Sequence, residues 1–190
     1  IEGLSATEAR KNHTPTDAVM DLMTQNNIAM PPTTVDTAGK DVMLNGKNIH
    51  MRIYTPKTGT GPFPVIVYYH GGGFVIAGID VYDASAKSLA QETGAIVVAV
   101  AYRKAPENKF PAAHDDAYAA YEWVTKNAGS IKGNANKIAL AGESAGGNLA
   151  VNTAIKTRDA KGKMPKAILA VYPVASSDMN SESYNKYAAA

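Results

Sequence analysis

A serine stands at the centre of Gly142-Glu143-Ser144-Ala145-Gly146, which has the pattern G-x-S-x-G. An apolar run precedes the pattern and a stretch of helical composition follows it, the context in which this motif marks a catalytic nucleophile. A strand that turns at once into a helix strains the middle residue, and side chains at Gly142 and Gly146 would collide with neighbouring elements. The Ser144 hydroxyl is then exposed at a helix N-terminus, where free amides and the helix dipole favour developing negative charge. We interpret Ser144 as a nucleophile rather than part of a chance glycine-rich helix start.

A second motif, His70-Gly71-Gly72-Gly73-Phe74, follows another apolar run. Successive glycines allow backbone N–H groups to point into a site without obstruction by side chains. The amides of Gly72, Gly73 and Ala145 are therefore expected to bind the oxyanion of a tetrahedral intermediate. A phosphate-binding loop would continue with Gly-Lys-Ser/Thr, and Phe74-Val75 stands there instead.

The elements that position these motifs are indicated by runs that are apolar at every residue. Such runs are typical of parallel strands covered on both faces. They cover residues 65–69, 95–100, 137–141 and 167–171, and helical stretches lie at about 82–92, 112–127 and 145–161. The alternation predicts an α/β fold with a mostly parallel, doubly wound sheet, right-handed crossovers and helices on both faces. Ligands bind beyond the carboxyl ends of such strands, which is where both motifs lie.

The N-terminal part of the chain has a different pattern. Residues 1 to about 30 are predicted to be helical, with a capping box at Ser5-Ala6-Thr7-Glu8 and an end at Pro31-Pro32. Two short runs, 41–44 and 49–54, are separated by Asn45-Gly46 and predict a β-hairpin.

The composition excludes several classes of function. A length of 190 residues suits one domain. The net charge of +2, from 19 basic and 17 acidic residues that are scattered, gives no sign of nucleic-acid binding. No apolar run has the length of a membrane span, and the absence of cysteine excludes disulfides and a catalytic thiol. No cluster of His, Asp and Glu has the spacing of metal ligands, so we expect no metal and no cofactor.

Both motifs, with two further segments, resemble the bacterial hormone-sensitive-lipase-like carboxylesterase family, which has the α/β-hydrolase fold. Carboxylesterases of the cholinesterase type share the two motifs, and the further segments, Tyr102–Glu107 and Phe110–Ala113, separate the groups. Family members usually have Leu at position 104 and Asp at position 143. We expect that neither difference, Lys104 or Glu143, changes a group that forms bonds in the reaction.

The resemblance implies roles for further parts of the chain. Residues 1–40 would form an N-terminal helical lid segment, and 41–190 the N-terminal portion of the α/β-hydrolase domain, with the C-terminal strands missing. Ser183–Ala188 resembles the start of the family's lid region. His70, Gly71, Gly142 and Gly146 would support the two motifs by shaping their loops, and Phe74 and Tyr172 are candidates for pocket walls.

A serine needs a base to act as a nucleophile, and the family order of Ser, Asp and His implies that the acid and the base lie beyond Ala190. We expect His13 and His50 to lie at the surface. A pairing of His114 with Asp115 as base and orienter is conceivable, although triad residues come from different loops, and helix capping and dipole effects account for Asp115-Asp116. Because residues 168–171 would be an exposed apolar edge strand, we expect the chain to be an incomplete piece.

The leading hypothesis is a serine carboxylesterase that hydrolyses short- to medium-chain acyl esters through an acyl-enzyme. Two alternatives remain open. One is a non-catalytic ligand-binding module on the same fold, as in plant hormone receptors that resemble this family, and the other is an amidase or peptidase with the same nucleophile. The expected partner is a small-molecule ester; nucleic acid and a membrane span are not expected. The family also implies that the full-length form can pair as a homodimer, and the cytoplasm is the default location.

Overall fold

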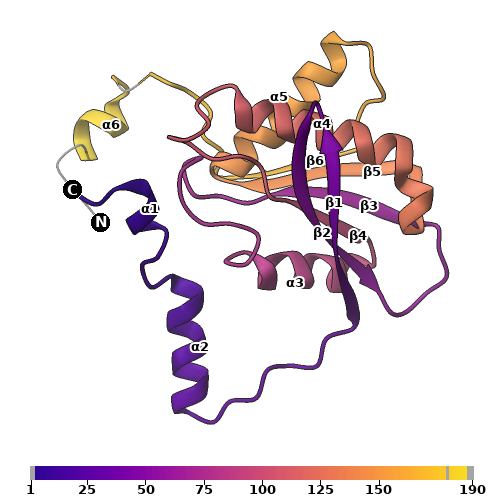
Figure 1. The fold of residues 1–190 in the computed structure, drawn as a ribbon, viewed down its shortest axis with the longest axis horizontal. Helices are drawn as coiled ribbons and strands as arrows, with labels where there is room; N and C mark the ends of the chain where they lie inside the picture. The colour runs from indigo at the N-terminus through magenta and orange to yellow at the C-terminus, as the bar shows by residue number, and fades with distance from the viewer. Residues whose placement is uncertain (1–2, 179, 188–190) are drawn as a thin grey trace.

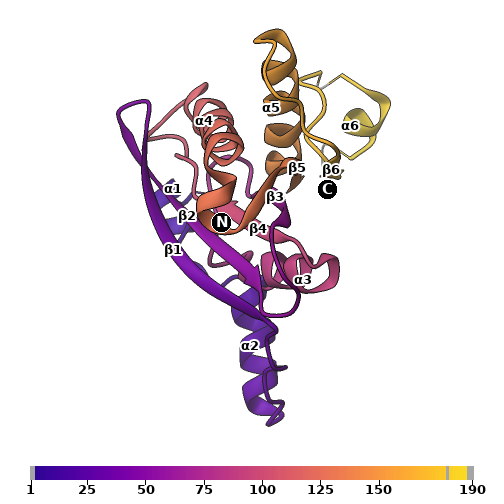
Figure 2. The same cartoon turned by 90° about the vertical axis from the view of Figure 1, so that its right-hand side faces the viewer.

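The computed structural model describes residues 3–178 and 180–187, and its centre is one twisted six-stranded sheet with helices on both faces (Figures 1 and 2). The strand order is β1-β2-β4-β3-β5-β6. β2 pairs antiparallel with β1 and β4, and the remaining pairs are parallel. The strands are β1 (Val35–Leu44), β2 (Lys47–Pro56), β3 (Phe63–Tyr69), β4 (Ile96–Val100), β5 (Gly133–Glu143) and β6 (Ile168–Val171).

The predicted hairpin is present and longer than the sequence pattern indicated. Asn45 and Gly46 both have positive φ, 49° and 71°, which is the conformation of a two-residue type I′ turn. This turn sets Leu44 opposite Lys47, and the pairing continues to Val35 opposite Pro56. The strands therefore extend well beyond the apolar residues that revealed them.

The helices of the α/β region lie close to the stretches read from the sequence. They are α3 (Asp83–Thr93), α4 (Ala112–Asn127), a 3₁₀ turn η1 (Ala128–Ile131) and α5 (Ala145–Asp159). α4 and α5 cover one face of the sheet and α3 covers the other (Figure 2). All five residues of β4 are buried, as expected for a strand that is covered on both sides.

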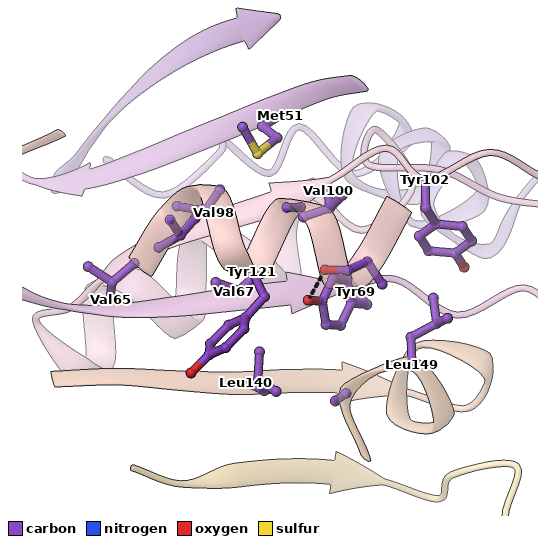
Figure 3. Packing of buried hydrophobic residues seen from close by; sticks show 14 of the residues in the cluster. Met51, Val65, Val67, Tyr69, Val98, Val100, Tyr102, Tyr121, Leu140 and Leu149 are labelled. Carbon is purple, nitrogen blue, oxygen red and sulfur yellow. Dashed lines mark hydrogen bonds between the residues drawn. The ribbon is translucent and has the colours of Figure 1, made fainter. Parts of the chain in front are cut away.

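The larger core lies between the sheet and the helices α4 and α5. Figure 3 shows Val67 and Tyr69 of β3 among side chains of neighbouring strands and of α4 and α5. The buried Tyr69 hydroxyl donates a hydrogen bond of 2.8 Å to the carbonyl of Ala117 on α4, so its polar atom has a partner. This packing fixes the carboxyl end of β3, from which the glycine loop begins.

The N-terminal region differs from the prediction of one long helical stretch. It contains α1 (Ala6–Ala9) and α2 (Pro15–Gln25), each with a capping box, at Ser5–Glu8 and at Thr14–Asp17. No described residue of either helix is buried, and α2 projects away from the sheet (Figures 1 and 2). β1 begins at Val35, so residues 35–40 of the predicted lid segment belong to the sheet; the lid role itself stays a prediction.

β6 forms one edge of the described sheet, and Ile168 and Leu169 on it are 43% and 53% exposed. After β6 the chain leads to α6 (Glu182–Tyr187); Ala188, the last residue of the predicted lid start, lies outside the described residues. Every helix in the described ranges is too short or too polar to cross a membrane. Residues 3–178 and 180–187 contain no group of three His, Asp or Glu side chains placed to hold a metal ion.

Candidate active site

Ser144 alone makes the turn between β5, which ends at Glu143, and α5, which begins at Ala145. Its φ of 55° and ψ of −115° lie outside the regions that a serine normally adopts. Such a conformation costs about 1–3 kcal/mol and persists only where the surrounding structure imposes it. The side chain is partly exposed and does not cap α5, so the hydroxyl is not used in holding the helix.

The backbone of Ser144 is fixed from the neighbouring strand. Its N–H donates to the carbonyl of Val171 on β6 at 2.9 Å. Its carbonyl accepts from Asn148 within α5, at 3.1 Å, and from Val174 in the loop after β6, at 3.2 Å. These three bonds hold the strained residue in place while leaving its side chain free.

The two glycines of the elbow allow backbone segments to touch. A Cβ at Gly142 would overlap the carbonyl of Gly146, and a Cβ at Gly146 would overlap the carbonyl of Tyr69 at the end of β3. Because the obstructing atoms are backbone, no side-chain movement would relieve the overlap. The collision predicted from the sequence is therefore present at both positions.

The glycine loop lies beside this elbow because β3 pairs with β5, with Tyr69 opposite Gly142. Gly72 and Gly73 have φ of 115° and 59°. The carbonyl of Gly72 accepts from the amides of Val75 and Ile76, at 3.0 and 2.9 Å. Among the described residues, the amides of Gly72, Gly73 and Ala145 donate to no backbone carbonyl of a loop or turn; Gly73 is exposed, whereas Ala145 is buried.

His70 is buried at the base of the glycine loop, with 1% of its surface exposed. Its ring stacks on Tyr102 with centroids 4.3 Å apart, and Nδ1 lies 2.6 Å from the carbonyl of Gly71. Since a carbonyl only accepts, Nδ1 carries the proton. Burial lowers the pKa of His70 to about 4, so the imidazole is neutral near pH 7. The Tyr102 hydroxyl donates to the His70 carbonyl at 2.7 Å, and the pair shapes the loop.

The remaining histidines have partners other than Ser144. His13 lies 3.3 Å from Asp21, and His50 lies 2.8 Å from Asp41, with side chains 59% and 41% exposed. His114 Nε2 lies 3.0 Å from Asn148 Oδ1.

Of the two carboxylates after His114, Asp115 lies in the first turn of α4, where the dipole interpretation expects it, and Asp116 has another role. Asp115 pairs with Lys156 at 2.8 Å, and no hydrogen bond of the described residues joins it to His114. Asp116 is 4% exposed and accepts from the backbone N–H and the guanidinium of Arg103, at 2.9 and 2.7 Å. Capping and dipole effects therefore do not account for Asp116, which anchors the segment after β4 instead.

The two departures from the usual family residues both have hydrogen-bond partners. Glu143 accepts from the hydroxyls of Tyr68 and Tyr172, at 2.7 and 3.3 Å. Burial and then the bond to Glu143 raise the pKa of Tyr68. Lys104 Nζ donates to the carbonyl of Ala77, and burial lowers the pKa of this ammonium. Both substitutions thus add contacts directly beside the elbow and the glycine loop.

An open cleft of about 440 Å³ reaches Asn148, one helical turn after Ser144, but neither Ser144 nor a glycine of the two motifs is among its lining residues. Phe74 lines it as expected, whereas Tyr172 is 69% exposed and is not among its lining residues. The lining residues are Phe74, Phe110, His114, Asn148, Asn152 and 174–177. Of these, the sequence pattern had singled out only Phe74 as a wall. The sequence did not single out Asn148 as a lining residue, because it lines the cleft through its position one turn after Ser144 on α5.

Comparison with known proteins identifies relatives of this chain. The family described as alpha/beta hydrolase fold matches residues 66–190, which confirms the predicted fold class. The chain is 41% identical to carboxylesterase NlhH of Mycobacterium tuberculosis over 80% of its length and 47% of that protein. It is 36% identical to an arylesterase of Saccharolobus solfataricus, over 84% of the chain and 52% of the relative.

Solved structures of esterases are also similar to this chain. An esterase of Pyrobaculum calidifontis superposes with a TM-score of 0.80 at 37% identity, covering 90% of this chain and 53% of that one. A thermostable esterase of Pseudomonas putida superposes with a TM-score of 0.83 at 29% identity, covering 97% and 56%. The chain therefore spans about half the length of these relatives.

Proposed function

The chain belongs to the hormone-sensitive-lipase-like family of the alpha/beta hydrolase fold, and on this premise we propose that it carries the nucleophile and the oxyanion hole of a serine carboxylesterase. The observation that carries the proposal is the conformation of Ser144. A serine held at φ 55°, with its backbone bonded on both sides and its hydroxyl not capping the helix, carries the kind of backbone strain that clusters at active sites.

The reaction would proceed through an acyl-enzyme. Ser144 Oγ attacks the ester carbonyl carbon as a base takes its proton, and the carbonyl oxygen becomes an oxyanion. The amides of Gly72, Gly73 and Ala145 bind that oxyanion, each stabilising the transition state by roughly 3 kcal/mol. The tetrahedral intermediate then collapses, the base returns the proton to the leaving alcohol, and water releases the acid by the same route.

In this proposal the base would be a His and the acid an Asp, supplied by further residues of the whole protein. Every histidine of this chain is bonded elsewhere: His70 is buried and donates to Gly71, and His114 bonds Asn148. His70 is also 1% exposed, and no hydrogen bond of the described residues joins it to Ser144. We therefore assign neither residue to proton transfer.

The cleft that reaches Asn148 would receive one arm of the ester. Its walls combine the rings of Phe74 and Phe110 with the amides of Asn148 and Asn152, which suits a short or medium acyl chain near a polar ester group. The residues before β1, which begins at Val35, and the residues from 181 onward would cover this cleft as a lid. The whole protein would act on a small-molecule ester, and pairing as a homodimer is part of the proposal.

The test is labelling of the whole protein, meaning this chain with the further residues that the proposal requires, by a fluorophosphonate. Peptide mapping should place the adduct on Ser144, and Ser144→Ala should abolish both labelling and hydrolysis of a chromogenic butyrate ester. An adduct on another residue would overturn the assignment. Comparing the ester with its matched amide tests the amidase alternative, and binding without turnover would indicate the ligand-binding module.

A further inference from the structure

Arg10, the residue that ends α1, reaches across the molecule to two loops of the α/β domain. Its Nε donates to the carbonyl of Val75 at 2.7 Å, and its Nη2 donates to the carbonyl of Ala105 at 2.6 Å. Both terminal nitrogens also bond Glu107, each at 2.8 Å. The side chain is 22% exposed, so these charge-assisted bonds are partly shielded from water.

The two carbonyls belong to segments that are already joined beside the proposed oxyanion hole. Ala105 N donates to the carbonyl of Phe74 at 2.9 Å, and Val75 N donates to the carbonyl of Gly72 at 3.0 Å. Val75 is therefore bonded on one side to Gly72 and on the other to Arg10. A guanidinium that holds the Val75 carbonyl restricts rotation of the peptide units that follow Gly72 and Gly73.

Arg10 is also a main attachment of the N-terminal segment, residues 3–28. None of the residues of α1 or α2 is buried. Apart from Arg10, the side-chain hydrogen bond that links this segment to the rest of the described chain is from Thr16 Oγ1 to the carbonyl of Val81, at 2.8 Å. Val75 and Val81 lie in the same connection between β3 and α3, so the segment is attached to the loop that begins with the glycines.

We propose that Arg10 is a positioning residue for the oxyanion hole. It locks the glycine loop to the Ala105–Glu107 segment and couples the placement of the N-terminal segment to the Gly72 and Gly73 amides. Only arginine suits this position, because its planar fork presents several donors in fixed directions, whereas a lysine ammonium would not span both carbonyls and Glu107. The inference rests on the proposed function for its catalytic meaning, although the coupling itself is a property of this chain.

Hydrogen exchange on the 190-residue chain tests the coupling without any activity. In Arg10→Ala and Arg10→Lys, the amides of Val75 and Ile76 should exchange about tenfold faster than in the unaltered chain. Glu107→Gln keeps the two carbonyl bonds and should change exchange less than about threefold. Arg158→Ala is the matched control, because Arg158 is 65% exposed and pairs only with its neighbour Asp159; it should leave both amides unchanged.

Amides of β4 report global stability in the same experiment and should keep their protection in every variant. Unchanged exchange of Val75 and Ile76 in Arg10→Lys would overturn the proposal. Faster exchange throughout β4 in that variant would overturn it equally, because Arg10 would then be a general stability residue.

Kinetics of the whole protein test the catalytic consequence. Because oxyanion donors act in the transition state, Arg10→Lys should lower kcat about tenfold and leave KM within about twofold. It should also weaken binding of a trifluoromethyl ketone, whose hemiketal with Ser144 Oγ places an oxyanion in the hole, by a similar factor. A rise in KM at constant kcat would refute the positioning role. If the unaltered whole protein neither hydrolyses esters nor labels at Ser144, the proposed function fails, whereas the exchange result stands or falls separately.

Discussion

Replacement of Gly146 by alanine is the sharpest test of the elbow geometry. The added Cβ would overlap the carbonyl of Tyr69 and lie 2.7 Å from the carbonyl oxygen of His70. Both obstructing groups are backbone at the end of β3, a strand that is paired on both sides. Overpacking a core costs about 1–3 kcal/mol when side chains adjust, so this substitution should cost about 3 kcal/mol or more. Each kcal/mol lowers Tm by about 2–4 °C at this chain length, which predicts a fall of at least about 6–12 °C.

Two further glycines provide a graded series on the same chain. At Gly147 a Cβ would lie 3.0 Å from Pro173 Cβ, a side-chain atom, so Gly147→Ala should cost about 1–2 kcal/mol. At Gly129 a Cβ would meet nothing within 4 Å, and Gly129→Ala should change stability by less than about 1 kcal/mol. Thermal melts followed by circular dichroism and urea titrations measure all three.

The order of the series is what the reasoning requires. If Gly146→Ala is no more destabilising than Gly129→Ala, the close approach of α5 to the end of β3 is wrong. The position of Ser144 relative to the glycine loop would then be wrong as well, because the same contact sets both. The expected order is the largest loss of stability in Gly146→Ala, an intermediate loss in Gly147→Ala and the smallest change in Gly129→Ala.

Three further predictions follow from the same contacts. Ser144→Gly should raise stability by about 1 kcal/mol, because glycine adopts positive φ without strain, while abolishing phosphonate labelling of the whole protein; a destabilised variant in urea titration would count against the strain. Burial lowers the pKa of His70 from 6.5 to about 4, so as the pH falls the unfolded chain binds a proton before the folded chain does. The free energy of unfolding, at its full value above about pH 6.5, should therefore decline by about 3 kcal/mol as the pH falls to 4. Denaturant titrations of His70→Gln should show a shallower decline over that range, and an unchanged slope would assign the acid sensitivity elsewhere. Asp116→Asn should cost about 3–5 kcal/mol, because it leaves the Arg103 guanidinium without the buried carboxylate it faces, whereas Asp115→Asn, which breaks an exposed pair, should cost less than about 1 kcal/mol.

The sequence predicted those parts of the fold that depend on local pattern. The apolar runs located β3, β4 and β5 because strands covered on both faces need no alternation, and they located β6 although it lies at the edge of the described sheet. Asn45-Gly46 located the hairpin because few residues tolerate that turn. The extent of β1 was missed, since most of its residues are exposed and are polar or small. The N-terminal region was predicted to be helical because Ala18, Val19, Leu22 and Met23 recur at helical spacing, yet Val19 and Leu22 are 55% and 57% exposed.

The residues of the candidate site also divide into those that a local sequence pattern predicts and those that it does not. Ser144 and the glycines carry local signals, because their backbone conformations exclude most other residues. Asp116 and Arg10 have no such local signal. The partner of Asp116 lies 13 residues away, and the partners of Arg10 include backbone carbonyls more than 60 residues away, which any residue type could supply. For Lys104 and Glu143 the sequence was used only to ask whether they belong to the reacting groups. Their hydrogen bonds to Ala77 and Tyr68 could not be predicted, because they depend on which loops the sheet brings together.

The bonds to Ser144 show why the edge strand matters to the site. β6 has four residues, and two of its side chains are half exposed, yet Val171 accepts the hydrogen bond from Ser144 N, and Val174 just beyond β6 donates to Ser144 O. β6 therefore helps to impose the strained conformation on which the proposed nucleophile depends. Proline at Val174 would remove one of these donors and leave the bond to Val171 intact. Such a variant should keep the fold of the sheet, measured by circular dichroism, and slow phosphonate labelling of Ser144 in the whole protein. Labelling at the unaltered rate would mean that the bond to Val171 alone fixes the elbow.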